Sequence, residues 1–217
     1  MNKAFASILI FVAVLLVVIV AVLSYESSLR DTASNRVVDS EYLYRDHAPA
    51  YGSDNAKVTI VEFLDPACGA CRAFYPLVKQ QLEQYGDKVR LEIRMLPFHS
   101  QVDQVVTALD AAQYQGKFWQ ALHVTLQFQD QWAIQHVAYV DKLYPILASA
   151  GIDIDKLKND MTNPNIAKHI AQDSADAVAL NVTKTPSFYV NGKPLTVFGY
   201  DQLVELIASE VAAQYPQ

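Results

Sequence analysis

Two cysteines with two residues between them, Cys68 and Cys71, are the only cysteines in this chain of 217 residues. Thiols with this spacing can close a disulfide and reopen it by exchange with another thiol. They follow a predicted strand, Val58 to Leu64, and Cys68 lies near the N-terminus of a predicted helix that runs toward Tyr85. The backbone N–H groups and the dipole at that position favour the thiolate, which is the form that attacks disulfides. Cys71, one turn deeper, is expected to be more buried and to act as the resolving thiol.

The strand and the helix that hold the cysteines are predicted from their residue patterns. Residues 58–64 form a short apolar, β-branched run that is closed by Asp65-Pro66, and a proline cannot continue a central strand. After the proline, apolar residues recur at helical spacing, at Cys71, Phe74, Tyr75, Val78 and Leu82. The cysteine motif therefore lies where a buried strand passes into a helix.

A static disulfide or half of a zinc site would also account for two cysteines. A tetrahedral zinc ion needs about four ligands. The five histidines form no short-spaced pair with one another or with the cysteines; they stand at positions 47, 99, 123, 136 and 169. A disulfide across two residues closes so small a loop that it removes little entropy from the unfolded chain. A redox-active pair is therefore the favoured interpretation, and no metal site is expected.

Composition bounds the class of protein. With 52% hydrophobic and 18% charged residues, the chain is typical of an ordered globular protein that can bury one good core. Its formal net charge of −6 gives no reason to expect nucleic acid as a partner.

The N-terminal region is predicted to be a membrane anchor. Ala4 to Leu23 is a 20-residue stretch whose single polar member is Ser7, and at about 1.5 Å per residue it matches a hydrocarbon core of about 30 Å. A cleaved signal peptide is the alternative, but its apolar region is usually shorter, about 7–15 residues, and the exit here is a poor cleavage site. Lys3 precedes the helix, so residues 1–3 are expected in the cytoplasm and the remainder outside. The polar residues 24–46 are interpreted as a linker to a domain formed by residues 47–217.

The remaining pattern predicts a second strand, a long helical stretch, a hairpin and a last helix. The second strand, Val89 to Leu96, alternates apolar with polar residues, and residues 101–181 follow with helical spacing. Asp153 and Asn163-Pro164 are typical helix starts, whereas Pro145 is expected to break or kink its segment. The hairpin is predicted to join residues 187–190 to residues 193–198 through Asn191-Gly192, and the last helix to cover residues 200–215.

Three motifs in this order resemble the DsbA family of thiol:disulfide oxidoreductases. The first is Val61-Glu62-Phe63 before Cys68-Gly69-Ala70-Cys71, the second is Gln115-Gly116-Lys117-Phe118-Trp119, and the third is Thr185-Pro186 before residues 187–192. The likeness runs from about residue 45 to the end. It implies an α/β, thioredoxin-like fold with an inserted helical domain at about residues 101–181, preceded here by the N-terminal transmembrane helix.

The resemblance also implies a role for each matching residue. Cys68 would be the nucleophile, Cys71 the resolving cysteine and Pro186 a cis-proline that faces the disulfide, with the Thr185 backbone as an edge for a substrate peptide. Glu62 would be a buried acid beneath Cys71, although an acid near a strand end is more often turned to water. His99 is assigned no role, and Phe118 and Trp119 are interpreted as the core of the insertion and not as a ligand site.

Gly69-Ala70 departs from the Pro-His pair that DsbA-type oxidases commonly carry between the cysteines. The expected function is nevertheless an extracytoplasmic oxidase that needs no cofactor beyond its own disulfide. Its partners would be unfolded or newly translocated client proteins, a quinone-linked membrane thiol oxidase, and the lipid bilayer through residues 4–23. A reductase or an isomerase of the same fold is an alternative, as is a non-catalytic copper or assembly chaperone that uses both thiols as soft metal ligands.

Overall fold

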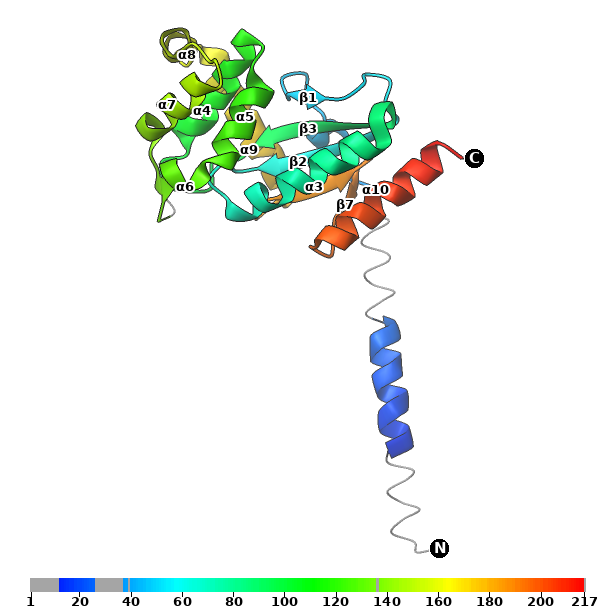
Figure 1. Ribbon diagram of the computed structural model, residues 1–217. Helices are drawn as coiled ribbons and strands as arrows, with labels where there is room; N and C mark the ends of the chain where they lie inside the picture. The colour runs from blue at the N-terminus through cyan, green and yellow to red at the C-terminus, as the bar shows by residue number, and fades with distance from the viewer. Residues whose placement is uncertain (1–11, 26–36, 39, 136, 217) are drawn as a thin grey trace, which may run out of the picture.

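The structure is a computed structural model, which describes residues 12–25, 37–38, 40–135 and 137–216. Its centre is a five-stranded sheet with the order β1-β3-β2-β6-β7 (Figure 1). The strands are β1 Ala50–Tyr51, β2 Val58–Leu64, β3 Val89–Met95, β6 Ser187–Val190 and β7 Lys193–Pro194. β2 and β3 are parallel, and the other neighbours are antiparallel. The predicted bounds of the strand before the cysteines are confirmed.

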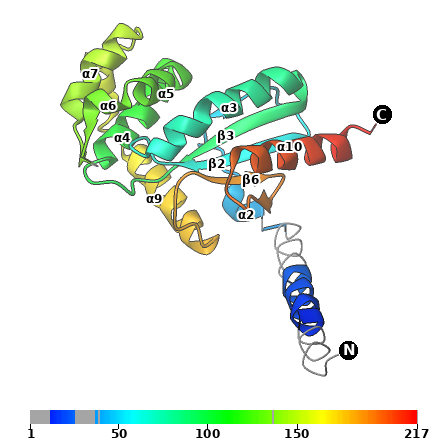
Figure 2. The same ribbon diagram turned by 60° about the horizontal axis from the view of Figure 1, so that its bottom comes forward.

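Helices cover both faces of this sheet. Helices α3 (Gly69–Tyr85) and α10 (Tyr200–Gln214) lie on one face, and α2 (Ser40–Leu43) and α9 (Pro164–Ala179) lie on the other (Figure 2). Side chains along β2 alternate between the faces. Ile60 and Leu64 pack in the same core as α3, and Val61 and Phe63 pack in the smaller core on the α9 side. Both faces of β2 are therefore buried.

The predicted helical insertion is present between β3 and β6. It contains α4 Asp103–Ala112, the 3₁₀ segment η2 Gln113–Gln115, α5 Phe118–Gln127, α6 Gln129–Trp132, α7 Val140–Ser149 and α8 Ile154–Asp160, and α9 completes it. Another 3₁₀ segment, η1 Gly86–Lys88, joins α3 to β3. Helices α4 to α8 gather beyond one end of the sheet, in green to yellow (Figure 1). The insertion also holds a short two-stranded sheet, β4 Ala133–Ile134 and β5 Val137–Ala138, that the residue pattern did not predict.

Two predicted helix starts are confirmed and one predicted break is wrong. The side chain of Asp153 accepts the N–H of Lys156, and that of Asn163 accepts the N–H of Asn165, each at 3.0 Å. Pro145, by contrast, lies inside α7. Its ring removes one backbone donor, but the fully buried Leu143 and Leu147 lie four residues apart on the core face of α7, so packing on both sides of the proline keeps the helix continuous.

The Asn191-Gly192 hairpin is confirmed, but its second strand is short. Both turn residues have positive φ, 49° and 81°, which is the requirement of the two-residue turn that matches strand twist. β7 ends at Pro194 and not at Phe198 as expected. Proline has no N–H with which to extend the ladder.

Part of the predicted linker belongs to the domain. Leu43 is fully buried, and the carbonyls of Tyr42 and Leu43 both accept hydrogen bonds from the Arg94 guanidinium on β3. Further upstream, the N–H of Val38 donates to the carbonyl of Gly192 at 2.9 Å. Residues 40–46 are too short and too polar to show a periodic apolar pattern, so their packing was not visible in the sequence.

The predicted anchor, Ala4 to Leu23, falls partly outside the described residues, because these begin at residue 12. Residues 12–25 are helical. Within the described ranges, no helix has both the length and the apolar character needed to cross a membrane. Residues 26–36 of the predicted linker also lie outside the described residues.

Candidate active site

The two cysteines occupy different environments at the start of α3. Cys68 is the N-cap residue of the helix and keeps 9% of its surface exposed, whereas Cys71, inside the first turn, is fully buried. Both are free thiols in this structure. Cys68 is thus the thiol that another molecule can reach.

The charge of the pair is set by hydrogen bonds within the motif. Cys71 donates to the Cys68 sulfur, and this bond lowers the pKa of Cys68 to about 5 against the opposing effect of burial, helped by the Thr185 side chain and then by backbone N–H groups of Cys71 and Ala70. The pKa of Cys71 is raised, first by burial and then by its own donation to Cys68. At neutral pH the reduced pair therefore consists of a thiolate at Cys68 and a thiol at Cys71.

The loop before β6 approaches Cys68 from the opposite side. The peptide bond between Thr185 and Pro186 is cis. The Cys68 sulfur lies 3.2 Å from the carbonyl oxygen of Thr185, to which the protonated thiol donates. The nucleophile and the Thr185 backbone are therefore adjacent, although 117 residues separate them in the chain.

Glu62 lies on β2 and is fully buried. By strand alternation it faces the same side of the sheet as Ile60 and Leu64, which is the side that α3 covers. Neither carboxyl oxygen has a hydrogen-bond partner among the residues that the structure describes. Burial, followed by the negative charge of Cys68, raises the pKa of Glu62 to about 8. The structure thus brings all five residues predicted for the site together: Cys68, Cys71, Glu62, Thr185 and Pro186.

The opposite pKa shifts of Glu62 and Cys68 give a testable pH dependence of stability in the reduced protein. The raised pKa of Glu62, about 8 against an ordinary 4.5, makes folding less favourable as pH rises between those values. The lowered pKa of Cys68, about 5 against 9.0, makes folding more favourable as pH rises between those values. Between about pH 5 and pH 8 the two contributions oppose each other. In Glu62→Gln only the Cys68 contribution remains, so the free energy of unfolding should rise by up to about 1.4 kcal/mol per pH unit.

Urea denaturation of the reduced protein across this pH range measures the effect. Thiol exchange should also be slower in Glu62→Gln, because the glutamine cannot exchange a proton with the cysteine pair. The double variant Glu62→Gln/Cys68→Ala is the matched control, since it lacks both shifted groups and should lose the added slope. Parallel pH profiles for the wild type and Glu62→Gln would contradict a buried, perturbed carboxyl.

Two residues that the sequence interpretation missed shape the loop before Cys68. Asp65 is fully buried, and its carboxylate accepts the backbone N–H groups of Ala67, Phe98 and His99 at 2.7–2.8 Å. It also lies 2.9 Å from the Nδ1 atom of His99. His99 therefore contacts a buried carboxylate and is not the exposed loop histidine that its position in the sequence suggested. The one signal for Asp65 in the sequence was its place between the strand and the cysteine motif.

The helical insertion also contacts this loop. Gln129 on α6 is buried, and its Nε2 group donates to the carbonyl oxygens of Pro66 at 2.8 Å and Cys68 at 3.0 Å. Next to it, Asp130 forms an ion pair of 2.6 Å with Arg72 on α3. Because Gln129 is about 60 residues from the cysteines and belongs to no motif, nothing in the sequence indicated this contact.

An aromatic cluster lies beside the cis-proline loop. Phe74 on α3 contacts Phe188, which follows Pro186 by two residues, with ring centroids 5.5 Å apart. It also contacts Phe198 at 4.7 Å and Tyr200 at 4.3 Å. The side chains of Phe198 and Tyr200 remain exposed, so apolar surface borders the site.

Comparison with known proteins agrees with this geometry. A family model described as thioredoxin matches residues 45–209. The chain belongs to the thioredoxin family. The probable disulfide bond formation protein D of Bacillus anthracis is 29% identical to it over 223 aligned positions, which cover 97% of both chains. The crystal structure of oxidised BdbD from Bacillus subtilis superposes with a TM-score of 0.67 at 25% identity, covering 76% of this chain and 93% of that one.

Several other proteins that match are much longer than this chain. The Na⁺/H⁺ antiporter NhaA of Herminiimonas arsenicoxydans is 29% identical over 144 residues, which are 66% of this chain and 22% of the antiporter. This chain thus spans about a quarter of the length of such relatives.

The fold and the position of the cysteine pair agree with the DsbA-like thioredoxin fold. The predicted fold class, an α/β thioredoxin-like fold with an inserted helical region, is confirmed, as is the resemblance to the DsbA family.

Proposed function

We propose that this protein donates disulfides to client polypeptides outside the cytoplasm. The observation that carries the proposal is the position of Cys68 at the N-cap of α3, where the Cys71 thiol and backbone N–H groups donate to its sulfur and lower its pKa to about 5. A stabilised thiolate favours the reduced form of the pair, and a pair that favours its reduced form is a stronger oxidant when it is a disulfide. This charge effect offsets the absence of Pro-His between the cysteines, because the Cys71 thiol and the backbone N–H groups stabilise the thiolate here.

The exchange would proceed in two steps. A client thiolate attacks the Cys68 sulfur of the oxidised pair, the bond to Cys71 breaks, and Cys71 leaves as a thiolate that takes up a proton. A second client thiolate then attacks the client sulfur of the mixed disulfide, and Cys68 leaves as a stable thiolate. Two electrons pass from the client to the pair, and the client gains the disulfide. Glu62, whose pKa is about 8, is suited to exchange a proton with Cys71 in the first step.

Client recognition is proposed to use the Thr185 backbone and the nearby aromatic surface. The Thr185 carbonyl beside the Cys68 sulfur lies where an extended client segment would pass during exchange. The exposed faces of Phe198 and Tyr200 suit apolar side chains of unfolded chains. Reoxidation of the pair is proposed to come from a quinone-linked membrane thiol oxidase.

The reduction potential of the Cys68/Cys71 pair tests the direction of catalysis. Equilibration with glutathione buffers, read by the mass added on alkylation, should give a value above about −200 mV. A value near about −270 mV, where thioredoxin lies, would mean that the protein reduces its partners. Known potentials in this fold span about 7 kcal/mol for two electrons, so the measurement separates the two directions clearly.

The anchor is part of the same proposal. The apolar side chains of the helix over residues 12–23 are exposed, as a lipid-facing segment requires. Cells that produce the full chain should retain it in the membrane fraction with an intact N-terminus, whereas a chain that starts after residue 23 should be released. A mature N-terminus near Ser24 would instead identify residues 1–23 as a cleaved signal.

A further inference from the structure

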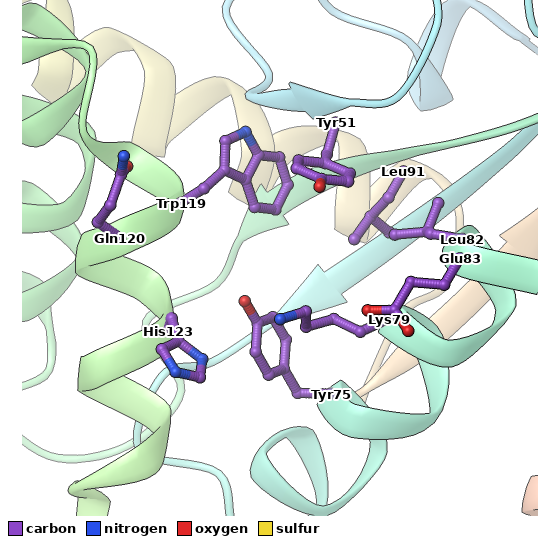
Figure 3. Close-up of a pocket in the computed structure, with 9 residues that line it drawn as sticks. All are labelled: Tyr51, Tyr75, Lys79, Leu82, Glu83, Leu91, Trp119, Gln120 and His123. Atoms are coloured by element: carbon purple, nitrogen blue, oxygen red, sulfur yellow. The ribbon is translucent and has the colours of Figure 1, made fainter. Parts of the chain in front are cut away.

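A cavity of about 260 Å³ lies between α3 and α5, beside β1 (Figure 3). Four aromatic rings line it, those of Tyr51, Tyr75, Trp119 and His123, and Leu82 and Leu91 add apolar surface. Neither cysteine lines it, and Tyr75 stands one helical turn beyond Cys71 on α3, a rise of about 6 Å, so the cavity is next to the cysteine pair but distinct from it.

Trp119 packs against the main core, as expected, and also forms one wall of this cavity. Phe118 is 4% exposed and does belong to the core, but the neighbouring indole is only partly buried. Its Nε1 group donates to the carbonyl of Ala50 at 3.1 Å, and its ring meets Tyr51 edge to face at 5.4 Å. The indole is thus held in place by β1 with one side open to the cavity.

Polar groups on α3 face the same space. Tyr75 is 8% exposed, and Figure 3 shows its hydroxyl directed into the cavity. That hydroxyl has no hydrogen-bond partner among the residues that the structure describes. Burial, followed by the charge of Glu62, raises the pKa of Tyr75 to about 12, so it remains a donor at neutral pH.

Lys79, one helical turn beyond Tyr75, also lines the cavity. It forms no ion pair with any described residue. Glu83, another turn further, lies at the far end of the cavity from Trp119 (Figure 3). The cavity therefore offers a cation and a tyrosine hydroxyl donor near its aromatic walls, with one negative charge at its edge.

We propose that this cavity binds a small planar aromatic monocarboxylate. Aromatic walls on an apolar floor suit a flat ring, and a carboxylate would accept hydrogen bonds from the Tyr75 hydroxyl and the Lys79 ammonium, both of which lack a partner in the described structure. The volume lies below the range of about 300–1,000 Å³ that is typical of drug-sized ligands, so it fits one or two fused rings. Glu83 disfavours a second negative charge on the ligand. The proposal does not depend on the direction of thiol exchange.

Titration with 2-naphthoate, followed by NMR of the tryptophan indole N–H groups, tests the site directly. The chain has two tryptophans. Trp132 is fully buried and donates to the carbonyl of Thr125 at 2.8 Å, so its signal serves as an internal reference for folding. The Trp119 signal, assigned by its loss in Trp119→Phe, should shift with saturation while the Trp132 signal stays in place.

Three variants separate recognition of the acid from general apolar binding. Lys79→Met keeps the stem of the side chain and should weaken 2-naphthoate binding about tenfold or more, while affinity for the neutral 2-naphthamide stays unchanged. Tyr75→Phe should weaken binding of the acid several-fold. Lys88→Met is the matched control, because the Lys88 ammonium lies over the Tyr215 ring, and it should bind like the wild type.

Three outcomes would overturn the proposal. One is a shift of both indole signals or of neither. Another is failure to saturate by about 10 mM ligand. The last is an equal loss of affinity for the acid and the amide in Lys79→Met.

Discussion

Reduced protein treated with a limiting amount of iodoacetamide at about pH 6 should be alkylated at Cys68 and hardly at all at Cys71. With a pKa of about 5, roughly nine-tenths of Cys68 is thiolate at that pH. Burial and donation to Cys68 keep Cys71 protonated, and its sulfur is fully covered. Because only the thiolate reacts, the initial labelling rates should differ by at least about 100-fold. Peptide mapping by mass spectrometry measures the ratio.

The pH dependence of labelling adds a second test. The rate at Cys68 should rise with an inflection near pH 5, and Cys71→Ala should move that inflection upward because the variant lacks the donor to the thiolate. Labelling of Cys71 before Cys68, or an inflection near the free value of about 8.5, would mean that the roles of the two thiols are reversed or that the thiolate is not stabilised.

Arg94→Met should destabilise the folded protein by about 3–5 kcal/mol, a factor of roughly 150 to 5,000 in the unfolding equilibrium. The Arg94 side chain is fully buried on β3. It donates to Asp173 at 2.7 Å and to Asp176 at 2.5 Å, and these carboxylates lie on α9. Methionine carries no charge, so the two carboxylates would lose the fully buried guanidinium that joins them, and Asp176 would keep only the partly exposed Arg45 as a cation among the described residues. Urea denaturation of the oxidised protein measures the loss.

Two further variants separate this effect from a general loss of packing. Asp173→Asn in the Arg94→Met background removes one unpaired charge and should restore part of the stability. Lys156→Met breaks the exposed Lys156–Asp160 pair on α8 and should cost no more than about 0.5 kcal/mol. If Arg94→Met were no more harmful than Lys156→Met, the buried ion network would contribute little to the fold.

Local sequence patterns were sufficient to predict the elements whose structure is determined by residues close together in the chain. The apolar run of β2, its closing Asp65-Pro66 and the helical spacing after Cys68 fix a strand that passes into a helix. Asn191-Gly192 fixes the hairpin because both residues tolerate positive φ. These elements also place Cys68 at the helix N-terminus, so the reactive chemistry could be read from the sequence.

The burial and pairing of several other residues depend on contacts between segments that are far apart in the chain. Arg94 occupies the polar side of an alternating strand, a position that suggests exposure to water. It is buried because α9 supplies carboxylates to it and α2 supplies carbonyls. His47 and His169, 122 positions apart in the numbering, stack with ring centroids at 4.5 Å.

The same reasoning applies around the cysteines and the cavity. Gln129 reaches the carbonyl of Cys68 from the insertion, and Trp119 becomes a cavity wall because its Nε1 group bonds to Ala50 in β1. No periodicity encodes such contacts, because a polar or aromatic residue looks the same in the sequence whether it faces water, a buried partner or a cavity. Burial and pairing are properties of the packed elements, and these properties determine the pKa values of Glu62 and Cys71.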